Sequence, residues 1–334
     1  MQIAKQIEIT PMQLIHSLRA YLITVAITWA VMIGAGIIYA QKRQIAAGFA
    51  VPIITAFLLE APLYIAPFFA SVRTAAARMN PWLLALGLAI SAVLPYVVYT
   101  VPTHCFGTLD FWRLCGLAAS LSFWYLVVPA TIWSDLLFLA GPVAVLISRI
   151  LRNIYGSPLE HEKVEILGHL MLIHVAAIAV LILRRLDGVN PGVIPTKREA
   201  WIGLRSFLMF LPLGLGLVKA MHLPWRAQPL NPAYALPIFA GTLVVTAWSE
   251  EFAVRGVVQQ HLTKLLGPVA GIGIASALFG LAHINFRFFP NWPMVILAGV
   301  AGIFFGVAYW QAKSIRASML THALVVMVWT LWFR

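Results

Sequence analysis

Long apolar runs, each about as long as a membrane span, follow one another through almost the whole chain, and short polar connections separate them. They cover roughly residues 21–40, 45–70, 82–101, 114–132, 134–151, 164–183, 200–219, 234–255, 267–284, 293–311 and 317–333. A helix needs about 20 mostly apolar residues to cross a bilayer, and the runs lack the alternation of a membrane barrel. We therefore expect an all-α, polytopic transmembrane helix bundle of about 9–11 membrane helices.

The composition agrees with a membrane location. Hydrophobic residues make up 61% of the chain and charged residues 10%, against about 45–50% and about 25% in soluble domains. This excludes an ordinary water-soluble enzyme, a disordered chain and a nucleic-acid binder. The net charge of +12 lies between the apolar runs, so we expect it to face anionic lipid headgroups. The two cysteines, Cys105 and Cys115, form no disulfide framework and no metal-ligand spacing.

A boundary is expected at the most polar interior connection, Arg184 to Glu199. It divides the chain into an N-terminal multi-helix membrane region of unknown role, residues 1–190, and a C-terminal block, residues 191–334. The segment before Tyr21 lacks a short apolar run with a small-residue cleavage site, so we expect an uncleaved N-terminus.

Four polar residues interrupt the apolar runs of the N-terminal region: Glu60, Asp135, His169 and His174. Each is isolated in sequence, which favours hydrogen bonding between helices over a role in substrate passage. An alternative is a transporter that uses Glu60, Asp135 and His174 as a relay. The absence of repeated halves counts against that alternative.

The C-terminal block contains a pair of adjacent acids followed by an arginine, Glu250, Glu251 and Arg255. On an α-helix Glu251 and Arg255 lie about 40° apart and can form an ion pair, whereas Glu250 lies about 140° from Arg255. One carboxylate is then committed to structure, and the other is left to accept a proton as a general base. The alternative is a single structural charge cluster.

Two histidines follow in later runs, His283 and His322. Each taken alone is more often a packing residue. Together with Glu250, two imidazoles supply the groups that activate a water and stabilise an oxyanion. The same three residues could equally be the ligands of a divalent metal such as zinc.

The depths in the membrane that helix lengths predict for Glu250, His283 and His322 agree only in part. A turn at Gly267 and Pro268 makes two helices antiparallel, so Glu250 and His283 come to equal depth. His322 lies only about 8 Å from the start of its own run. Either residues 256–266 bend, or the loop at residues 313–316 dips inwards.

The three groups, in this order, resemble the CPBP family of intramembrane proteases (CAAX proteases and bacteriocin-processing enzymes, also called Abi proteins). The family motifs EExxxR, FxxxH and HxxxN/D match Glu250 to Arg255, Phe279 to His283, and His322. The resemblance implies a glutamic-type or metallo-protease in which Glu250 and His283 activate water. It further implies that His322 stabilises the oxyanion, and that Glu251 and Arg255 support the site.

The family asparagine falls at position 326, where this chain has Val326. Valine donates no hydrogen bond, so part of the oxyanion hole is missing or comes from a group such as Thr321 or Asn285. The resemblance implies that the substrate is a membrane protein or a lipidated, hydrophobic peptide. It implies cleavage at a CAAX-type C-terminus, after a leader peptide or at a C-terminal tail. It also implies a multi-pass location in a bacterial inner membrane. The alternative is a non-catalytic peptide-binding or immunity protein of the same fold.

A stripe of three glycines, Gly299, Gly302 and Gly306, lies in the run before the last one. Small residues at this spacing let neighbouring helices approach closely. We therefore expect a structural role for this stripe.

Overall fold

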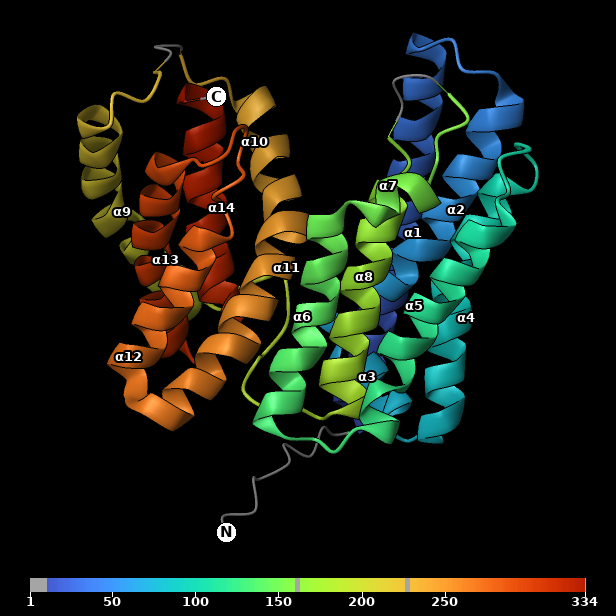
Figure 1. Ribbon diagram of the computed structural model, residues 1–334, viewed down its shortest axis with the longest axis horizontal. Helices are drawn as coiled ribbons and strands as arrows, with labels where there is room; N and C mark the ends of the chain where they lie inside the picture. Colours follow the sequence, from blue (N-terminus) through green and yellow to red (C-terminus); the bar gives the residue numbers. More distant parts are fainter. Residues whose placement is uncertain (1–10, 160–162, 226–228, 334) are drawn as a thin grey trace. The chain divides into compact units, whose positions relative to one another are not determined.

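The computed structural model describes residues 11–159, 163–225 and 229–333. All regular elements in these ranges are helices, and no β-strand occurs among them (Figure 1). The expected all-α fold is therefore confirmed. The expectation of an uncleaved N-terminus concerns residues 1–10, which lie outside the described residues. The chain divides into two compact units, Met1–Leu186 and Asp187–Arg334.

The first unit is a bundle of apolar helices. It contains α1 (Pro11–Lys42), α2 (Ala47–Ile65), the short turn Ala66–Phe68, α3 (Ala70–Ala76), α4 (Pro81–Thr100), α5 (Thr108–Val127), α6 (Ile132–Ser148), α7 (Ile150–Ile154) and α8 (Ile166–Ile178), which a π-helical turn, Ala179–Leu183, continues.

The second unit holds the remaining helices. They are α9 (Lys197–Ala220), α10 (Pro232–Gly241), the π-helical turn η3 (Thr242–Ala247), α11 (Trp248–Glu251), the π-helical turn η4 (Phe252–Gln259), α12 (Gln260–Leu281), α13 (Trp292–Ala312) and α14 (Ile315–Trp332). Helices α9, α13 and α14 pack against one another, and α12 packs against α13.

Eight helical segments of the described chain are long and apolar enough to cross a membrane. The protein is therefore an integral, multi-pass membrane protein. One segment, Pro232–Leu281, is 50 residues long and breaks at Gly267, where φ is 83° and ψ is 167°. It thus combines two of the eleven expected runs. Two other runs correspond to α5 and to the shorter apolar helix α6, which lie outside the eight.

Three of the four polar residues singled out in the apolar runs of the first unit, Glu60, Asp135 and His174, have charged or polar partners. Glu60 contacts His174 through Oε1 and Nδ1, and both side chains are fully buried. Arg184 donates from Nε to Asp135 Oδ1 over 2.9 Å. These contacts are of the kind expected for hydrogen bonding between helices. A relay through these residues stays a prediction.

The start of α14 is buried within the second unit rather than exposed at its surface. Ile315 and Ala317 are fully buried, and the Ile315 amide donates to the Val189 carbonyl over 3.3 Å. At the start of α9, Thr196 and Glu199 form a capping box. These contacts hold the start of α14 inside the second unit, and both alternatives for the depth of His322 in the membrane stay predictions.

The glycine stripe of α13 lies where other helices approach. A Cβ atom on Gly306 would lie 2.7 Å from the Gln259 Oε1 atom and 3.0 Å from a methyl carbon of Ile272. At Gly302 the nearest atoms, on Arg255 and Ser276, would be 3.2 Å away. Two of the three glycines therefore permit close packing of α13 on η4 and α12.

Candidate active site

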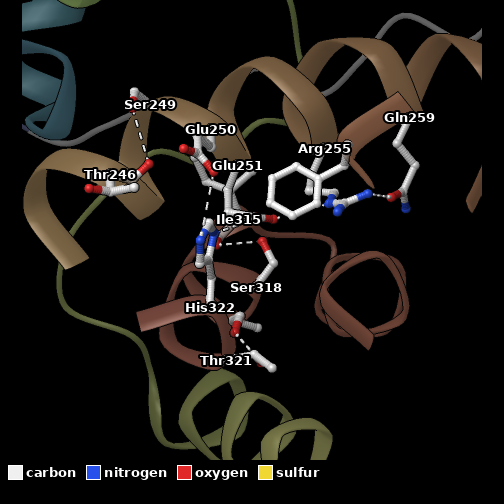
Figure 2. A network of polar contacts seen from close by, with 12 residues as sticks. Thr246, Ser249, Glu250, Glu251, Arg255, Gln259, Ile315, Ser318, Thr321 and His322 are labelled. Atoms are coloured by element: carbon white, nitrogen blue, oxygen red, sulfur yellow. Dashed lines mark hydrogen bonds and ion pairs between the residues drawn. The ribbon is translucent and has the colours of Figure 1, made fainter. Parts of the chain in front are cut away.

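Glu250 and Glu251 lie in a short α-helical segment between two π-helical turns. Segment α11 contains both acids, η3 precedes it and η4 follows it. Such wide turns inside α-helices are often found at functional sites. Figure 2 shows the two carboxylates on this helix facing His322, which comes from α14.

Glu251 forms a fully buried ion pair with Arg255. The Arg255 Nε atom lies 3.2 Å from Glu251 Oε2, and both side chains have an exposed fraction of 0%. Arg255 also donates to Gln259 Oε1 over 3.3 Å. Gln259 in turn donates to the carbonyl of Gly306 over 2.9 Å. The pair expected from helix geometry is therefore present, and Gln259 ties it to α13.

His322 lies between the two glutamates. Its Nδ1 atom is 2.9 Å from Glu251 Oε1, and its Nε2 atom is 3.7 Å from Glu250 Oε2. Because an ionised carboxylate only accepts hydrogen bonds, the Nδ1 atom carries a hydrogen. Glu251 thereby fixes the ring orientation and turns Nε2 towards Glu250. This resembles the way a carboxylate orients the imidazole in many hydrolases.

Glu250 differs from its neighbour in both exposure and partners. Its side chain is 36% exposed, whereas that of Glu251 is fully buried. Its Oε2 atom is buried and has no hydrogen-bond partner among the described residues. A buried oxygen left unpaired is costly unless a further group binds there. Glu250 is thus the carboxylate available to a water or a substrate.

His283 follows the C-terminal end of α12. Its Nδ1 atom lies 2.8 Å from the Phe279 carbonyl oxygen, which can only accept, so Nδ1 donates and Nε2 is left as an acceptor. The Phe279 ring lies 4.8 Å from the His283 ring and 5.7 Å from the His322 ring, centroid to centroid. In the following loop Asn291 donates to the Phe286 carbonyl over 2.8 Å and restrains this segment.

The two imidazoles line one apolar cavity of about 90 Å³. Its walls come from α9, α12, α13 and α14, and they include Val326. Glu250 contacts His322 but is not among the described side chains that line the cavity. The structure thus brings Glu250 to His322 and His322 to the cavity of His283.

The two expected substitutes for the family asparagine, Thr321 and Asn285, lie in different surroundings. The Thr321 hydroxyl is fully buried and donates to the Gly203 carbonyl over 2.9 Å or to the Ala317 carbonyl over 3.0 Å. It is therefore not available to a substrate oxyanion. Asn285 is exposed in the loop after α12.

The three candidate metal ligands do not fit a zinc site. No group of three or more histidine, cysteine, aspartate or glutamate side chains in the described ranges could hold a metal ion. The Nδ1 contacts with Glu251 and with the Phe279 carbonyl leave the Nε2 atoms free, so the spacing of the side chains, and not these contacts, is what argues against the site. We derive no chemical step through a metal held by Glu250, His283 and His322.

Two positioning residues were not expected from the sequence. Phe305 of α13 stacks on the His322 ring at 4.7 Å and 13°. Gln259 holds Arg255, as described above. Gln259 lies four positions after Arg255, and this helical spacing is the one sequence signal that could have indicated the contact between them. Phe305 gave no such signal, because its contact with His322 arises from helix packing.

The fold and this site define an integral membrane protein with a buried acid–imidazole centre. Comparison with protein families matches residues 232–328 to the family described as Type II CAAX prenyl endopeptidase Rce1-like. The matched segment contains all five expected site residues. The match confirms the resemblance drawn from the motifs, and it indicates a peptide hydrolase. Comparisons with curated proteins and with solved structures gave no match.

Proposed function

We propose that the chain is an intramembrane endopeptidase in which Glu250 and His283 activate the attacking water and His322 stabilises the oxyanion. The observation that carries this proposal is the position of His322. One of its nitrogens is held by Glu251 at 2.9 Å, and the other faces the unpaired oxygen of Glu250 at 3.7 Å. Glu251 and Arg255 are positioning residues in this proposal.

The reaction follows from the hydrogen-bonding capacity of each group. Glu250 takes a proton from water as the water oxygen attacks the peptide carbonyl carbon, and the carbonyl oxygen becomes an oxyanion. In this proposal His322 donates from Nε2 to that oxyanion. The Nε2 atom of His283 accepts the second hydrogen bond of the water. When the tetrahedral intermediate collapses, Glu250 returns its proton to the leaving amine.

The substrate class follows from the surroundings. The cavity walls are apolar, and the protein is embedded in a membrane. We therefore propose a membrane protein or a lipidated, hydrophobic peptide that is processed at a CAAX-type end, a leader or a C-terminal tail. The bacterial inner membrane is the proposed location, since the resemblance includes bacteriocin-processing enzymes.

A non-catalytic peptide-binding or immunity protein is the second candidate. The observation that favours it is Val326, which lines the cavity at the position of the family asparagine. Valine cannot donate to an oxyanion there. This candidate predicts binding of hydrophobic peptides without turnover.

Hydrolysis in ¹⁸O-labelled water tests the proposal. The full-length chain, reconstituted in liposomes, is incubated with a library of hydrophobic peptides, and mass spectrometry identifies new C-termini. We expect cleaved peptides that carry one ¹⁸O atom in the new carboxylate. Peptides that bind but stay intact across the library would contradict the proposal and support the second candidate.

A further inference from the structure

An apolar groove runs along α1 and α2 in the first unit. Its volume is about 620 Å³, and its lining includes Met32, Gly36, Ile54 and Phe57. This volume lies within the range of about 300–1,000 Å³ that is usual for small-molecule sites. One charged side chain, Lys163, belongs to the described lining of the groove.

A polar pocket of about 350 Å³ lies beside that groove. Its lining includes Arg149, Arg152, Lys163 and His169, together with a single acid, Glu165. Three permanent positive charges therefore face one negative charge. The three cationic side chains are exposed, so a ligand can reach them from outside the unit.

The groove and the pocket meet at Lys163, which lines both. They lie where α1 ends, α2 begins, α6 ends and α8 begins, and Figure 1 shows these helix ends towards one end of the unit. Two more cations lie nearby in the sequence: Lys42 is the last residue of α1, and Arg43 begins the α1–α2 connection. An apolar channel that opens into a cationic pocket is complementary to a molecule with a hydrocarbon chain and an anionic head.

We infer that the first unit binds one anionic glycerophospholipid of the surrounding bilayer. One acyl chain lies in the groove along α1 and α2. The phosphate lies against Arg149, Arg152 and Lys163, because guanidinium groups bind phosphate through paired hydrogen bonds and lysine adds a compact charge. This inference concerns residues 1–186 and does not depend on the proposed peptidase activity.

A phospholipid suits this site better than an apolar peptide does. The groove alone would accept either. The adjoining pocket carries three exposed cations and one acid, Glu165, so it attracts an anionic head and gives a neutral peptide segment no such electrostatic gain. A lipid headgroup also lies at the level where the ends of membrane helices emerge.

Native mass spectrometry of the purified, delipidated full-length chain tests the inference. Dioleoyl phosphatidylglycerol and dioleoyl phosphatidylcholine are titrated separately. We expect the first bound phosphatidylglycerol to bind at least about tenfold more tightly than phosphatidylcholine. Equal affinities would overturn the inference. So would an uncharged apolar peptide that binds as tightly as phosphatidylglycerol, because the groove would then belong to a polypeptide.

Two triple variants distinguish binding at this pocket from a general attraction between anionic lipid and the positively charged protein. Arg149→Gln, Arg152→Gln and Lys163→Gln together are expected to abolish the preference for phosphatidylglycerol. The matched control, Arg78→Gln, Arg113→Gln and Lys264→Gln, removes the same charge from side chains outside both linings, and it is expected to keep the preference. Loss of the preference in both triples, or in neither, would contradict the site.

A further variant tests the groove separately from the pocket. Ala50 lines the groove, and Ala50→Phe fills it without a change of charge. We expect its affinity for dioleoyl phosphatidylglycerol to fall by about fivefold or more, because the acyl chain loses apolar contact area. An unchanged affinity would contradict the placement of an acyl chain along α1 and α2.

Discussion

The Nδ1 atom of His322 lies 2.9 Å from the Oε1 atom of Glu251, although 71 positions separate the two residues in the sequence. Glu251 is thereby held on one side by an imidazole and on the other by Arg255 at 3.2 Å. The carboxylate closest to the structural arginine also orients the imidazole that faces the second carboxylate. The two acids of the pair thus have different surroundings, which fits different roles.

Glu251→Gln tests the orienting role. The change leaves the buried Arg255 without its counter-charge, so we expect stability to fall by about 3–5 kcal/mol. His322 also loses its fixed orientation, and the turnover of the folded fraction should fall by about 10²-fold or more. Thermal unfolding in detergent and peptide cleavage per folded molecule measure the two effects.

Glu199→Gln is the matched control for that variant. Glu199 pairs with Arg316 over 2.8 Å at the start of α9 and α14, outside the cavity. It should lower stability without a change in the turnover of folded molecules. If Glu251→Gln behaves in the same way, Glu251 has a structural role only.

Val326→Asn tests whether the cavity lacks an oxyanion donor. The new amide can donate into the cavity that His283 and His322 line. One such donor is commonly worth about 10²–10³ in kcat, so we expect turnover to rise while peptide affinity stays similar. An unchanged kcat would mean that another group already serves the oxyanion.

Gly306→Ala tests the packing that supports the site. The new methyl group would lie 2.7 Å from Gln259 Oε1, and we expect a loss of about 1–3 kcal/mol in unfolding free energy. Gly299→Ala is the control, since its nearest atom would be 3.6 Å away. A similar loss in both variants, measured by thermal unfolding, would show that the Gln259 contact is not the cause.

Removal of divalent metals tests the geometry of the three candidate ligands. The described side chains form no metal-binding group, so cleavage should continue at the same rate after dialysis against a chelator. The measurement is the initial rate before and after dialysis, with and without added zinc. A rate that falls and then returns with zinc would contradict the metal-independent reaction.

Much of the fold follows from the sequence because span length is a local property. Runs of about 20 apolar residues predict membrane helices directly. The number of spans is less certain from sequence, because a residue such as Gly267 can divide one long helix and α6 is only 17 residues long. The pairing of Glu251 with Arg255 is also local, since both lie on one helix four positions apart.

The position of His322 could not be predicted in the same way. The expected depth treated each run as a regular α-helix, whereas π-helical turns flank the glutamate pair. Contacts such as Phe305 on His322 depend on how helices pack, and no local pattern encodes them.

The most direct test of the proposed chemistry is the cleavage rate of Glu250→Gln, measured in liposomes against wild type and Ser249→Ala. In the described part of the chain, the Ser249 hydroxyl donates to the Val245 or Thr246 carbonyl in the preceding turn η3, so its variant controls for local disturbance. Glutamine keeps the size of Glu250 but cannot take a proton from water. We predict a loss of about 10²–10⁴ in kcat for Glu250→Gln, with peptide binding retained and Ser249→Ala unaffected. Cleavage by Glu250→Gln at the wild-type rate would contradict the assignment of Glu250 as the general base.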